Sequence, residues 1–283
     1  MNNRIEISTV IPCYNSESSI TILIESLIEE FETLGLNYEI ILIDDTSIDN
    51  TLEVIKELKI KLPTKNLRVF KSQNNFGQVT STLFGVSKST GNYILTIDDD
   101  LQHDPREFKN MYKTILNNDL DAVIAFWDAD ETYLRNITSS IFNFISNLIR
   151  FKSIKYRNTA FRLLNGNLKE PFLNYFIDKR WIDVRFITKK IGQIKALHNK
   201  PHGRQFMKTN HRVKIATLYL LFDTFLIEIF LLLFALLLSN NFLLFTILLI
   251  LFKLISKNRL KNNRKNLFFK SDNYVLQENN VNE

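Results

Sequence analysis

The sequence predicts an α/β domain with a mostly parallel sheet and helices on both of its faces, followed by a hairpin of two transmembrane helices. Short apolar runs alternate with longer amphipathic segments through the first 126 residues, which is typical of strand–helix repeats. Residues 215–256 are almost wholly apolar, with only Asp223, Glu228 and Lys253 charged. The mean hydropathy of −0.07 therefore averages a polar first part and a membrane-like second part.

Five short runs have the composition of buried strands, and four longer segments between them have apolar residues at helical spacing. The predicted strands are residues 5–11, 38–43, 67–70, 93–97 and 122–126, and the predicted helices are residues 18–34, 49–62, 77–87 and 105–116. Strands that are apolar throughout indicate a parallel sheet covered on both faces. Ligands of such sheets bind beyond the carboxyl ends of the strands. We therefore expect the site at Cys13–Asn15, Asp44–Asp45, Ser72–Asn75 and Asp98–Asp100.

Charge divides the chain into two halves of opposite sign. Residues 1–132 hold 11 Lys and Arg against 22 Asp and Glu, whereas residues 133–283 hold 25 against 8. Together with the hydropathy this predicts four parts: an acidic ligand-binding half (1–132), a basic half with interfacial helices (133–214), the membrane hairpin (215–256) and a polar cytoplasmic tail (257–283). We expect the tail to be poorly ordered.

Several classes of protein are excluded by the composition. The single cysteine, Cys13, cannot form an internal disulfide, and no Cys/His pairs have zinc-finger spacing. The first twelve residues contain no apolar stretch of signal-peptide length. Residues 133–214 lack a nucleic-acid reader motif and run directly into apolar sequence, so we expect no nucleic-acid partner.

Three consecutive aspartates, Asp98, Asp99 and Asp100, follow a predicted buried strand. They repel one another unless a positive group shares the site, and a divalent cation is the simplest such group. Because side chains alternate along an extended segment, Asp98 and Asp100 should point the same way, with Gln102 next on that side. Oxygen ligands favour Mg²⁺ or Mn²⁺. The alternative is a solvated acidic turn that caps the helix at Pro105.

A second acidic pair, Asp44–Asp45, ends the strand before it. One of these carboxylates could accept a hydrogen bond from a base N–H or from ribose hydroxyls, and Asp49 could cap the next helix. Taken alone, the pair favours the capping role. A phosphorylated receiver domain also has strand-end aspartates, but its acidic pair follows the first strand, and it does not explain the basic half or the apolar segment.

Five segments of the chain resemble, in order and spacing, the family 2 glycosyltransferases, and within them the polyprenyl-phosphate glycosyltransferases. The segments are Val10–Glu17, Asp44–Thr51, Asn75–Gln78, Gly91–Tyr93 and Asp98–Pro105. The resemblance covers residues 5–126 well and implies a GT-A type, Rossmann-like fold. It also implies a metal-dependent, inverting transfer of a sugar from a nucleotide-sugar to a polyprenyl phosphate, as in the biosynthesis of cell-envelope glycans.

The resemblance further implies roles for individual residues. Residues around the nucleotide-sugar would be Pro12, Tyr14, Asn15, Glu17, Asp44, Asp45, Asn75, Gln78, Asp98 and Asp99. The metal ligands would be Asp98, Asp100 and Gln102, and the catalytic group would include Asp100 together with Arg135 and Arg162 near the sugar and the acceptor phosphate. The sequence departs from the family at Tyr156, where relatives have an acid. Of a later basic signature only His198, Gly203 and Phe206 remain.

A lipid phosphate as acceptor accounts for the charge map, because a dianionic phosphate at an anionic membrane needs Arg and Lys nearby. Such a phosphate is already deprotonated near neutral pH and can attack without a general base. If the acceptor were instead a sugar hydroxyl of a lipid-linked glycan, a base would be needed, and Asp183 is the best candidate; its alternative role is a helix cap. A catalytically inactive homologue that acts as a membrane scaffold is a third hypothesis, which Tyr156 favours.

The apolar segment has two interpretations. Residues 229–252 carry no charge and, as a helix, extend about 36 Å, enough for one span. Residues 239–241, Ser-Asn-Asn, would then lie at the bilayer centre, so we favour a hairpin with arms 216–238 and 242–256. Basic residues flank both ends, which predicts a multi-pass inner-membrane protein with its catalytic domain in the cytoplasm. A homo-oligomer remains open.

Overall fold

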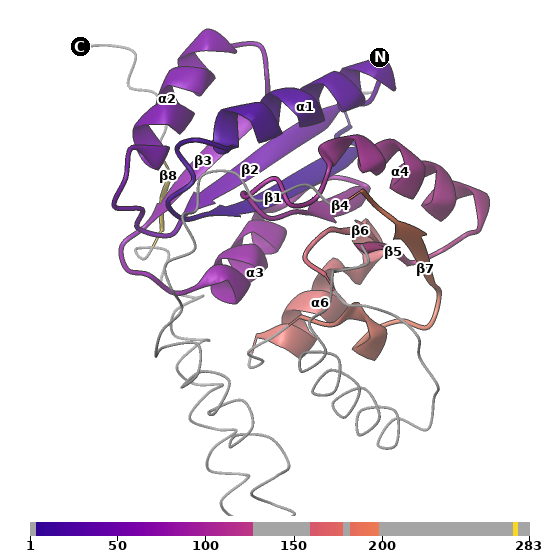
Figure 1. Ribbon diagram of the computed structural model, residues 1–283. Helices are drawn as coiled ribbons and strands as arrows, with labels where there is room; N and C mark the ends of the chain where they lie inside the picture. Colours follow the sequence, from indigo (N-terminus) through magenta and orange to yellow (C-terminus); the bar gives the residue numbers. More distant parts are fainter. Residues whose placement is uncertain (1–3, 127–158, 178–181, 198–273, 277–283) are drawn as a thin grey trace, which may run out of the picture. The chain divides into compact units, whose positions relative to one another are not determined.

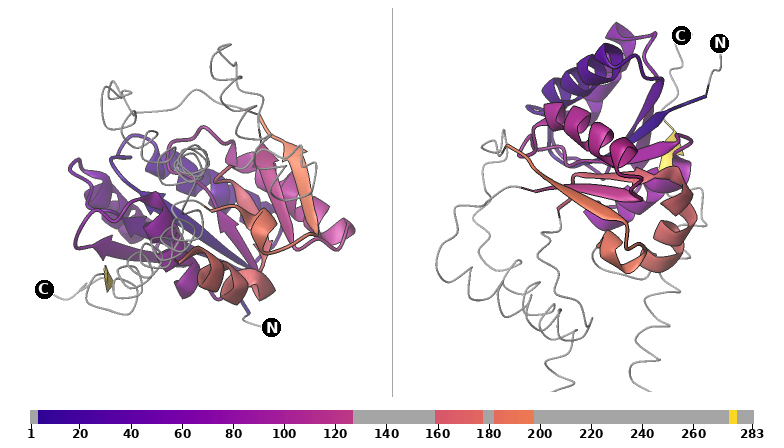
Figure 2. Two further views of the ribbon diagram at one scale, coloured as in Figure 1. Left: turned by 90° about the horizontal axis from the view of Figure 1, so that it is seen from below. Right: turned by 90° about the vertical axis from the view of Figure 1, so that its right-hand side faces the viewer.

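The structure is a computed structural model that describes residues 4–126, 159–177, 182–197 and 274–276 (Figure 1). The chain forms two compact units, one of residues 1–203 with 271–283 and the other of residues 204–270. All described residues belong to the first unit. These residues form an eight-stranded mixed sheet with helices on both faces, in the order β7-β5-β6-β4-β1-β2-β3-β8 (Figures 1 and 2).

Four parallel strands form the centre of the sheet, in the order β4-β1-β2-β3. Their bounds are β1 (Ile7–Cys13), β2 (Tyr38–Asp44), β3 (Leu67–Ser72) and β4 (Tyr93–Thr96). The helices between and after them are α1 (Ile20–Thr33), α2 (Thr51–Lys61), α3 (Gln78–Lys88) and, after the short η1 (Pro105–Glu107), α4 (Phe108–Asn117). Every predicted helix and strand of this region is present, with ends shifted by a few residues. The α/β prediction is therefore confirmed.

Beyond this centre the sheet is mixed, because an antiparallel strand is inserted there. Six of the eight described strands still run in the same direction, so the prediction of a mostly parallel sheet is confirmed in part. The strand β6 (Arg162–Asn165) lies antiparallel between β4 and β5 (Ala122–Phe126), and β7 (Ile191–Lys195) lies parallel to β5. The strands β6 and β7 are not continuous apolar runs, so only their long-range pairing identifies them. Between them lie η2 (Gly166–Leu168), α6 (Lys169–Phe176) and η3 (Val184–Phe186).

A further strand comes from the C-terminal segment, where we expected little order. The strand β8 (Tyr274–Leu276) pairs antiparallel with the end of β3, so residue 276 faces residue 70 and residue 274 faces residue 72. The polar composition of 257–283 did not predict this strand. An edge strand is held by backbone hydrogen bonds to its neighbour and does not need a long apolar run.

The core explains why the central strands are apolar on both faces. All seven residues of β1 are buried, since α1 and α4 cover one face of the sheet and α3 covers the other (Figure 1). On the α3 face, Gly85 allows close packing: a Cβ at this position would lie 2.3 Å from Cγ1 of Val10 and 2.7 Å from Cδ1 of Ile43. This close approach positions the start of α3 at the carboxyl edge of the sheet.

Several predictions fall on residues that the structure does not describe. These are the membrane hairpin at 215–256, most of the basic half and the residues Arg135, Tyr156, His198, Gly203 and Phe206. Within the described ranges, none of the helices is both long and apolar enough to cross a membrane.

Candidate active site

The carboxyl ends of three central strands lead into strained loops. Asn15, Thr46 and Leu101 follow β1, β2 and β4 respectively, and their φ angles are 53°, 61° and 58°. Positive φ is uncommon for residues other than glycine and is unfavourable for a β-branched residue such as Thr46. Backbone strain of this kind clusters at functional sites, where the surrounding structure holds it. The strain therefore marks the edge at which the sequence predicts the site.

Hydrogen bonds lock the first two of these loops together. The Asn15 amide donates to Ser47 Oγ at 3.1 Å, and the Ile48 amide donates to Asn15 Oδ1 at 2.9 Å. The Glu17 carboxylate accepts from the Asn50 amide at 2.9 Å. Asn15 and Glu17, which we expected at the nucleotide, therefore use these atoms to fix the loops.

The structure also places Tyr14 and Asp49 at these loops. The Tyr14 side chain lies at the same edge and is 37% exposed, so its ring is accessible to a ligand. Asp49 precedes Asn50, the N-cap residue of α2, and accepts from the Thr51 amide at 3.0 Å at the start of this helix.

The acidic pair after β2 has two different environments. Asp45 is 2% exposed, and its carboxylate accepts from the amides of Phe76 at 2.9 Å and Gly77 at 2.7 Å. The Asn75 side chain donates to the Asp45 carbonyl at 3.3 Å. Asp45 thus holds the loop before α3. Asp44 accepts from the Ser47 amide at 3.3 Å, and burial raises the pKa of both carboxyls.

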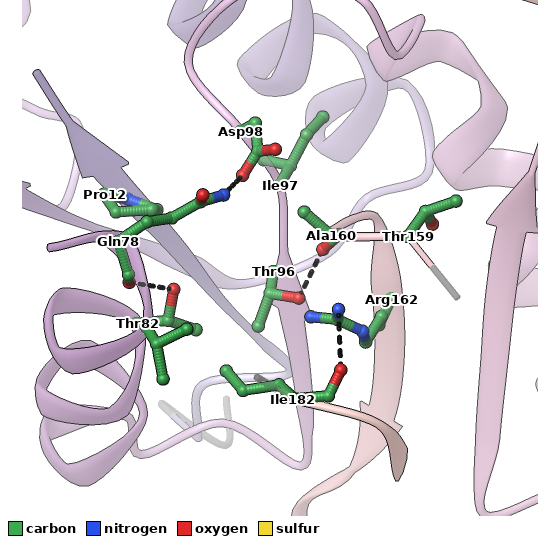
Figure 3. Close-up of a pocket in the computed structure, with 11 residues that line it drawn as sticks. Pro12, Gln78, Thr82, Thr96, Ile97, Asp98, Thr159, Ala160, Arg162 and Ile182 are labelled. Atoms are coloured by element: carbon green, nitrogen blue, oxygen red, sulfur yellow. Dashed lines mark hydrogen bonds between the residues drawn. The ribbon is translucent and has the colours of Figure 1, made fainter. Parts of the chain in front are cut away.

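The acidic triplet after β4 divides into three roles. Asp99 is buried, and its Oδ2 accepts from the Tyr14 amide at 2.9 Å, so it joins the β4 loop to the β1 loop. Asp100 Oδ1 accepts from the Gln102 amide at 3.2 Å, which closes a local turn. Asp98 accepts from the Gln78 side chain and borders a cavity (Figure 3).

The alternative role for the triplet, as a cap for the helix at Pro105, belongs to another residue. Asp104 accepts from the Arg106 amide at 3.0 Å and caps η1.

The cavity is about 270 Å³ in volume and lies between α3, β4, β6 and residue 182 (Figure 3). Its lining residues are Pro12, Gln78, Val79, Thr82, Thr96, Ile97, Asp98, Thr159, Ala160, Arg162 and Ile182. Arg162 is 6% exposed and donates to the Ile182 carbonyl at 3.3 Å. Its register on β6, opposite Thr96 of β4, brings this guanidinium to the same cavity as Asp98.

The two charged groups of the cavity perturb each other. The pKa of Asp98 is raised to about 7, mainly by burial and then by the charges of Asp100 and Asp99, while Arg162 and Gln78 oppose the rise. The pKa of Arg162 is lowered to about 10 because burial outweighs the opposing charges of Asp98 and Asp183. Carboxyl groups with strongly raised pKa values at a strand end are typical of functional sites.

The donor set fits a hard divalent cation only in part. The carboxylates of Asp98 and Asp100 repel each other, and a cation between them would relieve this repulsion. Among the residues the structure describes, no three His, Cys, Asp or Glu side chains are grouped to bind a metal. Mg²⁺ commonly uses one or two carboxylates and completes its shell with water and substrate phosphate. The site therefore fits a cation that a diphosphate helps to hold, with Gln102 beside Asp100.

The candidate base Asp183 already has a structural role. It is 2% exposed, caps η3 by accepting from the Arg185 amide at 3.1 Å, and accepts from Arg185 Nε at 2.7 Å and Nη2 at 2.6 Å. Both carboxylate oxygens therefore have an arginine partner.

Sequence reasoning missed seven of the eleven residues that line the cavity. Thr159, Ala160 and Ile182 reach it only because the chain returns to the sheet as β6, and Thr96 lies inside a strand that looks purely structural. The one usable signal was the polar Thr96 in an otherwise apolar strand.

The fold and its acidic carboxyl edge define a GT-A type glycosyltransferase, a nucleotide-sugar-dependent enzyme. The chain belongs to glycosyl transferase family 2, whose description matches residues 8–174, more than half of its length. The prediction of the family and of an enzyme is confirmed.

Two curated relatives carry names that specify a lipid phosphate. Dodecaprenyl-phosphate galacturonate synthase of Rhizobium johnstonii is 26% identical over 207 residues, which cover 70% of this chain and 61% of the relative. Undecaprenyl-phosphate 4-deoxy-4-formamido-L-arabinose transferase of Aeromonas hydrophila is 28% identical over 172 residues, 61% of this chain and 50% of the relative. The chain thus spans less than two thirds of either relative.

Solved structures support the fold. The mannosyltransferase PcManGT of Pyrobaculum calidifontis, in complex with GDP-Man and Mn²⁺, has a TM-score of 0.50 at 14% identity, with 72% of this chain and 59% of that chain covered. Mannosyl-3-phosphoglycerate synthase of Rubrobacter xylanophilus has a TM-score of 0.50 at 15% identity, with 77% and 74% covered. At these identities the likeness concerns the α/β fold alone.

Proposed function

We propose that the protein transfers a sugar from a nucleotide-sugar to a polyprenyl phosphate, with inversion at the anomeric carbon. The observation that carries this proposal is the single cavity bordered by both Asp98 and Arg162. The carboxylate side suits a cation and the diphosphate of the donor, and the guanidinium suits an acceptor phosphate. The names of the two curated relatives support the lipid phosphate as acceptor.

On the donor side, Mg²⁺ or Mn²⁺ would bind at Asp98 and Asp100. The Mn²⁺ and GDP-Man in the Pyrobaculum structure support this choice of cofactor and donor class. The cation would neutralise charge that develops on the departing nucleoside diphosphate. Asp44 and the exposed Tyr14 ring lie on the loops that would receive the nucleoside.

On the acceptor side, Arg162 would orient the phosphate towards the anomeric carbon. One phosphate oxygen forms the new bond to the anomeric carbon. The bond between that carbon and the diphosphate oxygen breaks at the same time, and the nucleoside diphosphate leaves. The dianionic phosphate carries no proton that must be removed, so this step needs no general base. A single displacement of this kind inverts the configuration.

A sugar hydroxyl as acceptor is the second candidate, and the environment of Asp183 disfavours it. A hydroxyl must lose its proton to a base, and the candidate base has both oxygens bound by Arg185 at 2.6–2.7 Å. Such pairing stabilises the carboxylate and makes it a weaker base. The phosphate acceptor avoids this requirement.

The proposal includes attachment to the inner membrane through residues 215–256, with the catalytic unit in the cytoplasm. The pairing of β8 with β3 supports an even number of crossings, because residues before and after the apolar segment then belong to one sheet. A hairpin meets this condition and a single span does not.

The direct test is to incubate membranes that contain the full chain with radiolabelled nucleotide-sugars, polyprenyl phosphate and Mg²⁺ or Mn²⁺. We expect label in the lipid fraction with one donor, and its loss in Asp100→Ala. Asp119→Asn is a matched control, since this side chain is 95% exposed and forms an exposed ion pair with Lys190. If no common donor labels lipid, the proposal fails. Metal-dependent nucleotide binding that Asp100→Ala abolishes would separately argue against an inactive homologue.

A further inference from the structure

The β3 edge of the sheet receives a strand from a distant part of the chain. The chain leaves the first compact unit after residue 203 and rejoins it at residue 271, and β8 then pairs with Phe70, Lys71 and Ser72 (Figure 1). Without β8, the N–H and C=O groups on this side of β3 would form an open edge. Addition of an extended segment to such an edge is a recurrent mode of recognition.

The paired residues of β3 lead directly into the donor site. Ser72 is opposite Tyr274 and is also the anchor of the following loop, because its Oγ donates to the Asn74 carbonyl at 2.5 Å. Two residues later, the amides of Phe76 and Gly77 donate to the Asp45 carboxylate. The segment 73–77, which we call the donor loop, is therefore held by hydrogen bonds to Ser72 at the end of β3 and to Asp45.

The donor loop also determines where α3 begins. Gly77 precedes α3 with a φ of 84°, and Gln78, the first residue of the helix, donates to Asp98 at the cavity. A continuous series of contacts thus runs from Tyr274 through Ser72 and the donor loop to Asp98. A displacement at β8 would be transmitted to the carboxylate that borders the cavity.

We propose that β8 is a docking strand that holds the donor loop in place, so that its seating on the β3 edge increases the affinity for the nucleotide-sugar. The occupant is this chain's own segment 274–276, as the pairing itself shows. The effect on affinity rests on the proposed function, because the ligand is the donor of that reaction. The effect of β8 on the order of β3 and the donor loop does not depend on the proposed function. The described part of this contact has three residue pairs, and backbone hydrogen bonds worth about 1 kcal/mol each allow it to be reversible.

The test introduces two consecutive prolines, Val275→Pro with Leu276→Pro, into the full chain. Alternate residues of a strand direct their N–H groups to the same neighbour, so one of two consecutive prolines removes a ladder hydrogen bond whichever residue faces β3. The matched control is Asn280→Pro with Val281→Pro, which adds the same prolines beyond β8. Amide hydrogen exchange of residues 67–77 is measured in both, together with binding of UDP and of GDP in the presence of Mn²⁺.

We expect faster exchange in residues 67–77 and about three- to tenfold weaker nucleotide binding in the β8 variant only, with kcat at saturating donor unchanged. Exchange in β1 and β4 should stay as in the unchanged protein, which separates this effect from unfolding. Unchanged exchange at β3 would overturn the proposal. If exchange rises but the chain transfers no sugar to lipid, the proposed reaction fails and the docking role stands.

Discussion

The two ends of strand β2 carry buried carboxylates in opposite electrostatic conditions. At the amino end, Glu39 is 2% exposed and accepts from Ser8 Oγ at 2.6 Å, the Thr90 amide at 2.7 Å and Arg68 Nη1 at 2.7 Å. Burial alone would raise its pKa, but these hydrogen bonds lower it. At the carboxyl end, Asp44 is 1% exposed, and burial raises its pKa despite the hydrogen bonds from Ser47.

The difference separates structure from function. A buried charge whose lone pairs are occupied by donors and a cation stabilises the folded state, whereas one with an uncompensated charge costs stability. Proteins retain the second kind where a ligand completes the site. The carboxyl edge, with Asp44 and Asp98 both raised in pKa, has this character, and the amino edge does not.

The largest expected effect comes from removing the cation or its ligand at the carboxyl edge. EDTA, or Asp100→Ala, should lower transfer by about 10³-fold, because charge on the leaving diphosphate would no longer be neutralised. The melting temperature of Asp100→Ala should not fall, since the substitution removes repulsion with Asp98. Activity and thermal melting measured on the same preparation check this. A large loss of stability would mean that Asp100 belongs with Glu39 as a structural group.

Arg162→Met should reduce transfer by about 10²-fold and should raise the KM for polyprenyl phosphate more than the KM for the donor. The long apolar side chain preserves most of the packing of this buried residue. Steady-state kinetics with each substrate varied in turn provide the measurement. Lys169→Met is the matched control, because Lys169 donates at 2.7 Å to the carbonyl of Ser89, at the C-terminal end of α3 and outside the cavity. An equal rise in both KM values would contradict an acceptor role.

At the amino edge, Glu39→Gln should reduce the free energy of unfolding by about 1–3 kcal/mol while activity per folded molecule stays unchanged. The substitution keeps the shape of the side chain but leaves the guanidinium of Arg68 without its carboxylate, and one donor of the new amide faces existing donors. Urea unfolding, with transfer assayed well below the transition, tests both parts. A fall in specific activity would show that this edge is coupled to the site.

The two carboxylates of β2 should also give stability a pH dependence of opposite sign. Because the pKa of Glu39 is lowered in the folded state, its contribution is present above the unfolded value of 4.5 and is lost as pH falls through the folded pKa. Because the pKa of Asp44 is raised, its contribution is favourable below the unfolded value of 3.8 and is lost as pH rises through the folded pKa.

Asp44→Asn should therefore increase stability at pH 7, by about 0.5–1 kcal/mol, and Glu39→Gln should decrease it. Urea unfolding of both variants at pH 4 and pH 7 measures the two signs. A loss of stability at pH 7 in Asp44→Asn would contradict the contrast between the two ends of β2.

The two edges also differed in how well the sequence predicted them. Local hydrophobic periodicity predicted the central strands and helices, and the acidic strand ends indicated the site, because both signals lie within short segments. The network around Glu39 could not be predicted, since Ser8, Arg68 and Thr90 converge on it only after three strands have paired. For the same reason, the position of Arg162 opposite Thr96 required the antiparallel β6. The hydrogen bonds from the Phe76 and Gly77 amides to Asp45 likewise form only when the loop before α3 meets the end of β2.

The smallest expected effect is at Asp183, which shares features of both the structural and the functional carboxylates. Its pairing with Arg185 and its cap of η3 resemble the satisfied state of Glu39, yet its charge acts on Arg162 at the cavity. If the acceptor is a phosphate, Asp183→Asn should change transfer by less than about threefold, because the neutral amide can still cap η3 and no proton has to be removed. If the acceptor is a hydroxyl, the same substitution should abolish transfer. The rate of label incorporation into lipid, compared between Asp183→Asn and Asp104→Asn, distinguishes the two cases. Asp104 caps η1 and pairs with Arg106 in the same way, but its charge is not among those that act on Arg162.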